Sequence, residues 1–70
     1  MKGENNMENN RFHQHRREIA AISARENVDI SVACSILAKE KGWTKYGAEE
    51  RDFKLYVNRM PAHDRAKYFE

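Results

Sequence analysis

The sequence has few of the cysteines that small proteins use to form disulfides or to bind structural metals, and it has no long apolar segment. Cys34 is its single cysteine, so no disulfide can form within the chain, and we expect a reducing, cytoplasmic location. No apolar run approaches the ~18 residues of a membrane span, so we expect neither a membrane helix nor a signal peptide. The three glycines, Gly3, Gly42 and Gly47, are isolated, which argues against a glycine-rich phosphate loop.

A strong excess of charge of one sign is also missing. Thirteen basic and eleven acidic residues give a net charge of +2, which is weak support for nucleic-acid binding. Hydrophobic residues make up 40% of the 70 residues, enough for one small domain but not for a large core. A core of this size typically yields only ~3–5 kcal/mol, so we expect it to depend on well-packed helices or on self-association.

The chain divides into a polar tail and one helical domain. Residues 1–9 lack apolar groups that could offset the entropy of ordering, so we expect a disordered tail followed by a domain over residues 10–70. Asn10 is placed to cap a first helix, in which Phe12, Ile19 and Ile22 fall on one stripe. This helical pattern fades at the sequence ENVD, before Asp29.

A second helix is predicted from Ile30 to Lys41, with Asp29 as its N-cap. Its first eight residues, ISVACSIL, are apolar almost all round, so we expect a central, buried helix. Gly42 is placed for the left-handed position that ends many helices, and Trp43 is placed to fold back onto the last turn.

A third helix is predicted to open between Thr44 and Ala48 and to end before Pro61, because a proline pushes the preceding residue out of helical geometry. Its apolar stripe consists of Tyr46, Phe53, Tyr56, Val57 and Met60. Residues 61–70 predict a short fourth helix, with Ala62, Ala66 and Phe69 on one side. The sequence therefore predicts an all-α fold, a small three-helix domain with a short fourth C-terminal helix.

The stretch NRFHQHRRE contains the residues with the most chemical potential, but its spacing does not favour a metal site. His13 and His15 are two positions apart and point to nearly opposite sides of a helix. Two metal ligands on one helix prefer a spacing of about three or four residues. We therefore expect no metal and no cofactor, with His15 partly buried in the apolar stripe and His13 solvated.

Catalytic chemistry is not predicted either. Cys34 lies in the most apolar helix, where a thiol is usually an inert packing group. Glu49, Glu50 and Asp52 are grouped, but acidic residues at a helix start are explained by the helix dipole. We expect no catalytic residues and no enzymatic activity.

DNA binding is one of two functional hypotheses. Arg11, Arg16 and Arg17 form a basic group, and Arg51 and Lys54 would add contacts from the third helix. The segment from Ile30 to Val57 has the order helix, glycine-containing turn, helix, as in a helix-turn-helix.

The match to that motif is incomplete. Ala38, Gly42 and Trp43 suit the first helix and the turn. Ala48 and Arg51, however, stand where the second helix should be locked into the core, and Lys41 occupies a normally apolar position. The alternative interpretation of the arginines is a solvated helix face.

Protein docking is the leading hypothesis. Leu55 lies opposite the Phe53 stripe, near Ala48, with Asp52 and Arg59 around it. Ala20, Ala24 and Val28 form a second apolar line on the first helix. Such two-faced helices indicate burial against something further, which is Tyr68 and Phe69 of the same chain, a second copy, or another protein. The sequence therefore favours a small non-enzymatic regulatory protein, of the type that mobile elements carry, acting as a homodimer.

Overall fold

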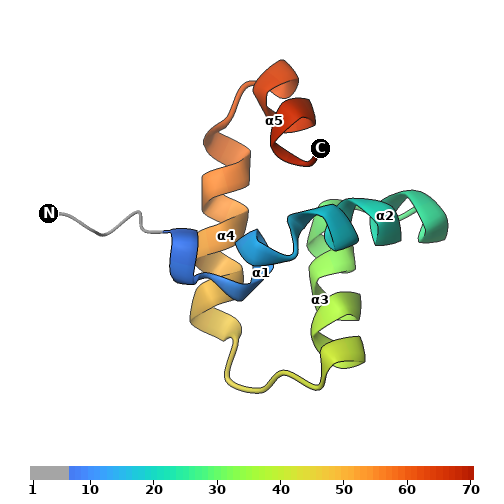
Figure 1. Ribbon diagram of the computed structural model, residues 1–70, viewed down its shortest axis with the longest axis vertical. Helices are drawn as coiled ribbons and strands as arrows, with labels where there is room; N and C mark the ends of the chain where they lie inside the picture. Colours follow the sequence, from blue (N-terminus) through green and yellow to red (C-terminus); the bar gives the residue numbers. More distant parts are fainter. Residues whose placement is uncertain (1–6) are drawn as a thin grey trace, which may run out of the picture.

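The computed structural model describes residues 7–70, and this part of the chain is entirely helical between its loops. In chain order the elements are a 3-10 turn η1 (Met7–Asn9), α1 (Arg11–Gln14), α2 (Arg16–Glu26), α3 (Ile30–Lys41), α4 (Gly47–Arg59) and α5 (Ala62–Tyr68) (Figure 1). The predicted all-α fold is confirmed. Of the predicted tail, residues 1–6 lie outside the described part, whereas Met7–Asn9 form a helical turn.

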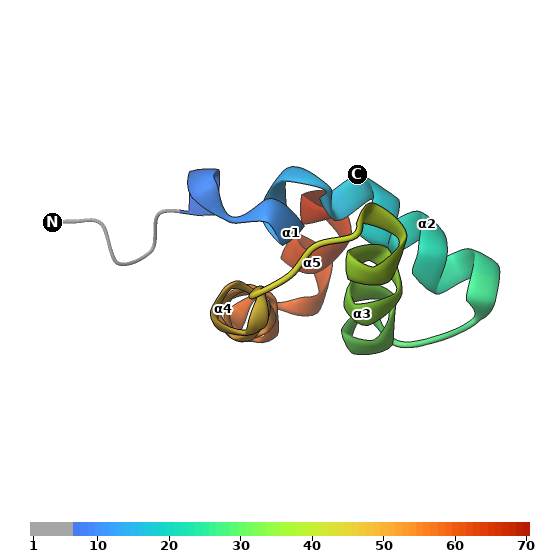
Figure 2. The same ribbon diagram turned by 90° about the horizontal axis from the view of Figure 1, so that it is seen from below.

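Two helices form the base of the fold and the others lie across it. Helices α3 and α4 run roughly antiparallel and are joined by the loop of residues 42–46 (Figure 1). Figure 2 shows this pair end-on, with α1, α2 and α5 on the same side of it. Helix α1 contacts α4, while α2 packs along α3. The core therefore lies between the α3–α4 pair and the layer formed by the other helices.

The buried side chains come from the stripes that the sequence predicts. Fully or nearly fully buried apolar residues are Phe12, Ile19, Ile22, Ala33, Cys34, Leu37, Ala38, Phe53 and Val57. Phe12 is central: its ring centroid lies 5.3 Å from that of Trp43, 5.8 Å from Tyr46 and 5.9 Å from Phe53. This aromatic cluster joins α1 to both ends of the 42–46 loop and to α4.

The predicted first helix is interrupted at His15. The predicted cap is present, because Asn10 Oδ1 accepts hydrogen bonds from the backbone N–H of Phe12 (2.9 Å) and His13 (3.2 Å). His15 has φ −113° and ψ 26°, and its Nδ1 lies 2.9 Å from the carbonyl oxygen of Arg11. Arg16 Nη1 donates to the carbonyl oxygen of His13 at 3.0 Å. Side chains thus bond carbonyls near the break, and the change of direction lets α1 contact α4 while α2 packs on α3.

Helix α3 ends as predicted but is not buried all round. Gly42 has φ +71°, and the N–H of Trp43 donates to the carbonyl oxygen of Ala38 at 3.0 Å. Val32, by contrast, is 46% exposed, because α3 is covered on only part of its circumference. Asp29 occupies the N-cap position without a side-chain capping hydrogen bond.

The chain reverses at Pro61, and the C-terminal segment packs only partly as predicted: Phe69 packs against the core, but Ala62 and Ala66 do not. Met60 has an extended ψ of 140°, which ends α4 before the proline as predicted. Tyr68 and Phe69 lie 6.2 Å and 6.3 Å from the Phe53 ring, centroid to centroid. The predicted inner residues Ala62 and Ala66 are exposed, since the two aromatic rings bury far more apolar surface than two alanine methyl groups.

Candidate functional site

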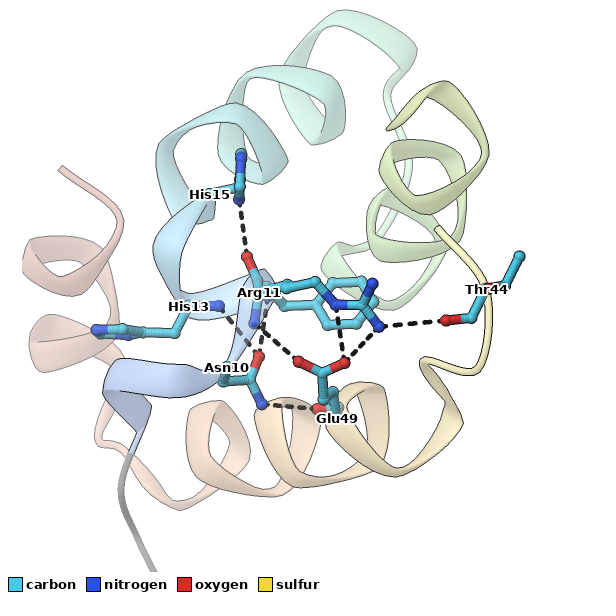
Figure 3. Close-up of polar contacts among 7 residues, drawn as sticks. Asn10, Arg11, His13, His15, Thr44 and Glu49 are labelled. Carbon is cyan, nitrogen blue, oxygen red and sulfur yellow. Dashed lines mark hydrogen bonds and ion pairs between the residues drawn. The ribbon is translucent and has the colours of Figure 1, made fainter. Parts of the chain in front are cut away.

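The arginine and histidine stretch that begins the domain forms an intramolecular junction between α1 and α4 (Figure 3). Arg11 Nε donates to Glu49 Oε1 at 2.9 Å, and its backbone N–H donates to Glu49 Oε2 at 3.1 Å. Asn10 Nδ2 donates to the backbone carbonyl oxygen of Glu49 at 2.9 Å. The Arg11 guanidinium also lies over the Trp43 ring, 5.0 Å from its centroid, and donates to the carbonyl oxygen of Thr44 at 3.3 Å.

The Arg11–Glu49 pair of this junction is electrostatically favourable and partly shielded from water. Hydrogen bonds from the Arg11 side chain lower the pKa of Glu49, and partial burial of the carboxyl group opposes this shift. Their side chains are 29% and 32% exposed, so the pair is shielded from water only in part. Sequence reasoning missed this pair because 38 residues separate its members, and only the Asn10 cap is a local signal.

His13 is not solvated, which corrects the expectation from the sequence. Its Nδ1 lies 2.6 Å from the Tyr68 hydroxyl, so it contacts α5. Burial lowers the pKa of His13, and the nearby Arg16 guanidinium lowers it further. Burial also raises the pKa of Tyr68, so the hydroxyl stays protonated. His15 is partly buried as expected, 5.2 Å from the Trp43 ring.

The five basic residues of the DNA hypothesis are divided among different roles. Arg11 belongs to the junction, and Arg16 Nε donates to the backbone carbonyl oxygen of Tyr68 at 3.0 Å. Lys54 Nζ lies 3.2 Å from the Glu50 carboxylate. Arg17 and Arg51 are exposed, on α2 and α4 respectively. The structure therefore does not bring the three N-terminal arginines together as one free basic group.

The helix-turn-helix interpretation has no geometric support. In that motif the two helices cross at about 90–120°. Helices α3 and α4 instead run roughly antiparallel (Figures 1 and 2). Ala48 and Arg51, at the positions where the motif would lock its second helix, are exposed, and Phe53 and Val57 face the core.

Reactive and metal-binding chemistry is sparse in the described part of the chain. Cys34 is fully buried, and burial raises its pKa to about 12, which keeps the thiol protonated. Within residues 7–70, no three His, Cys, Asp or Glu side chains are grouped as metal ligands. An open pocket of about 340 Å³ lies between the start of α3, α4 and α5; its charged lining residues are Asp29, Lys54 and Arg65.

The side of α4 that points away from the core carries most of the predicted docking residues. We define the α4 outer face as six exposed residues: Ala48, Arg51, Asp52, Leu55, Asn58 and Arg59. Leu55 is 50% exposed, the most exposed large apolar side chain among residues 7–70. The alternative that Tyr68 and Phe69 cover Leu55 is wrong, because both aromatic rings pack on Phe53.

The charged side chains beside Leu55 have few partners of their own. Arg51 Nε lies 3.9 Å from Asp52 Oδ1, and these two side chains are 72% and 56% exposed. Arg59 forms no ion pair or side-chain hydrogen bond with any residue of the described range 7–70. The α4 outer face therefore combines one exposed leucine with charged side chains that form few ion pairs or hydrogen bonds within residues 7–70.

The second predicted apolar line, on α2, does not form a comparable surface. Ala24 is exposed and Ala20 is half-buried, but both side chains are single methyl groups. Val28, the one large member, packs against the core. The structure thus places the exposed apolar area of the predicted docking residues mainly on Leu55.

Comparison of the chain with protein-family models, with curated proteins and with solved structures gives no match. Within residues 7–70, no helix has both the length and the apolar character needed to cross a membrane.

Proposed function

We propose that this chain is a non-enzymatic regulatory protein that acts by docking on a protein through the α4 outer face, with a second copy of itself as one partner. The observation that carries the proposal is the 50% exposure of Leu55 on a helix whose opposite side is buried. In a domain with so small a core, burial of a large exposed apolar side chain by a partner would add a favourable free energy that the isolated chain lacks.

The geometry of α4 supports a docking role. Its inner side is fixed by Phe53 and Val57 in the core and by Glu49 in the junction, so the helix is held at several points. A helix anchored in this way presents its outer side chains in a fixed arrangement, which lowers the entropy lost on binding. A partner that covers Leu55 would complete the burial of α4.

The same proposal separates docking from the DNA hypothesis. Of the three N-terminal arginines, Arg17 is the one with no ion pair or hydrogen bond to residues 7–70, so at most a small flattening of the salt slope is expected if all three are replaced. Protein docking predicts no measurable binding to duplex DNA at physiological salt. Sequence-selective duplex binding at sub-micromolar protein would favour the DNA hypothesis instead.

Replacement of Leu55 by aspartate tests the docking proposal. Because the side chain is half exposed, Leu55→Asp should keep the helical content and most of the melting temperature of the isolated chain. Its mass in solution, measured by sedimentation over a range of concentrations, should become that of a monomer. Ala24→Asp is the matched control, since it adds the same charge at an exposed apolar position on α2 and should keep self-association.

Two outcomes would contradict the proposal. One is a wild-type chain that is monomeric at every concentration tested. The other is a Leu55→Asp variant that associates as strongly as the wild type. Either result would show that the exposed leucine is not part of a self-association contact.

A further inference from the structure

The charges of the α4 outer face have a symmetry that identifies how two copies would meet. Asp52 and Arg59 are seven residues apart, which places them on one edge of the helix, two turns or roughly 10 Å from each other. Leu55 lies between them along the axis. From these positions we infer that the partner of the α4 outer face is the same face of a second copy, with the two α4 helices antiparallel and Asp52 of each chain paired with Arg59 of the other.

The inference rests on the proposed function and follows from two-fold symmetry. In an antiparallel pair of identical helices, the two-fold axis lies between the helices and perpendicular to both. It brings one edge of the helix against the same edge of its copy, in the reverse direction. A residue before the midpoint therefore faces the residue that lies equally far after it.

The midpoint between Asp52 and Arg59 falls beside Leu55. In this register both aspartates face arginines, so two reciprocal ion pairs flank a Leu55–Leu55 contact at the centre. On the other edge of the face, the same register brings each Arg51 level with Met60 of the copy, roughly 3 Å along the axis from the neutral Asn58. No like charges of the face oppose one another.

A parallel pair of α4 helices has a two-fold axis that runs along the helices, so it brings the edge with Asp52 and Arg59 against the other edge of the copy. Asp52 would then lie near Arg51 of the copy, whereas Arg59 would lie near the neutral Asn58. The antiparallel arrangement is the one that gives Arg59, which forms no ion pair within residues 7–70, a carboxylate partner.

The size of the contact sets the strength that we expect. Helix α4 has 13 residues and is about 20 Å long, so a single pair of these helices makes a small interface. Small interfaces are typical of weak, reversible complexes. We expect a dimer that dissociates on dilution and that is weakened by salt, since both ion pairs lie at the rim of the contact.

Charge exchange tests the register directly, because the dimer is symmetric. Asp52→Arg places arginine against arginine at both flanks, and Arg59→Asp places aspartate against aspartate. Each variant alone should self-associate more weakly than the wild type, by roughly tenfold or more in Kd, because two attractive pairs become repulsive. In an equal mixture of the two variants, every flanking contact joins one arginine with one aspartate, so a mixed dimer should form with nearly wild-type Kd.

Native mass spectrometry distinguishes the mixed dimer from either homodimer, since the two variants differ in mass. Arg51→Asp is the control: this residue lies on the other edge, so its loss should leave the mixing behaviour unchanged. The milder variants Asp52→Asn and Arg59→Gln, which remove attraction without adding repulsion, should weaken self-association by a smaller factor. Helical content of each variant, checked by circular dichroism, confirms that only association is compared.

The outcomes separate the register from the proposed function. If Leu55→Asp abolishes association but the charge variants bind with wild-type Kd, the face is correct and the antiparallel register is wrong. If the single variants are weakened and their mixture shows no mixed dimer, the reciprocal pairing is also wrong. If the wild type never self-associates, the register and the homodimer in the proposed function both fail.

Discussion

The two sides of α4 differ sharply in how they are used. On the inner side, Phe53 and Val57 are buried. Glu49 accepts hydrogen bonds from Arg11 through both carboxylate oxygens and from Asn10 through its backbone carbonyl oxygen. On the outer side, Leu55 is half exposed, and its charged neighbours form one long contact of 3.9 Å. One helix thus carries a buried, hydrogen-bonded side and an exposed side with few contacts.

This difference indicates which residues maintain the fold and which are free for another role. Buried apolar residues and shielded hydrogen bonds contribute to the free energy of unfolding, whereas exposed charges contribute little. Substitutions on the inner side should therefore lower stability whatever the concentration. Substitutions on the outer side should change association and leave the isolated chain folded.

The largest expected effect is that of Phe53→Ala. Removing a fully buried phenylalanine typically costs about 3–5 kcal/mol, which is comparable to the whole stability of a domain of this size. The variant should be largely unfolded at 25 °C by circular dichroism. Phe53→Leu, which keeps most of the apolar volume, should remain folded and unfold at a lower urea concentration than the wild type. A folded, cooperative Phe53→Ala variant would show that the inner side is not the core.

Glu49→Gln should have the next largest effect, about 1 kcal/mol, because the charge-assisted hydrogen bonds to Arg11 are weakened while the pair is one-third exposed. The pKa of Glu49 is lowered by Arg11, so its contribution is complete above the unfolded pKa of about 4.3 and is lost as pH falls through the lower folded pKa. Urea unfolding at several pH values should show this loss in the wild type and not in the variant. Glu18→Gln, at an exposed pair with Lys41, is the control and should change little.

A smaller effect is expected from His13. Burial holds the folded pKa of His13 below its ordinary value of 6.5, so the unfolded chain binds more protons as pH falls past that value. Stability should be complete above it and should decrease as pH falls toward the folded pKa, where α5 begins to lose its contact with α1. His13→Gln removes the titrating group, and its unfolding midpoint should vary less between pH 7 and pH 5. An identical pH profile in both proteins would show that the His13–Tyr68 contact does not sense protonation.

Leu55→Ala should have the smallest effect on the isolated chain, within about 0.5 kcal/mol of the wild type at dilute concentration. The same substitution should weaken self-association at high concentration, since it removes most of the apolar area of the outer face. If Leu55→Ala lowered the stability in dilute solution as much as a core substitution does, the outer side of α4 would be part of the core rather than a free surface.

Local signals in the sequence predicted much of this fold. The Asn10 cap, the left-handed Gly42 and the stop at Pro61 all act within one helical turn, so a single sequence is sufficient to find them. The spacing of Phe12, Ile19 and Ile22, and of Phe53 and Val57, likewise predicted which faces are buried, because periodicity reflects one helix at a time.

The parts that could not be predicted depend on contacts between distant segments. The Arg11–Glu49 pair and the His13–Tyr68 hydrogen bond join residues 38 and 55 positions apart, and neither has a local signature. The break at His15 follows from the need to reach two helices at once. For the α4 outer face, the sequence indicated Leu55 as out of place, but only the position of Tyr68 and Phe69 showed that the chain does not cover it.

The burial of Cys34 has a practical consequence for following this protein in solution. The only thiol of the chain lies in the core with a pKa of about 12, so a thiol-specific reagent reacts with it only after the helices separate. Its labelling rate therefore measures how often the domain opens transiently. Association through the outer side of α4 stabilises the closed form, so labelling of Cys34 should become slower as the protein concentration rises.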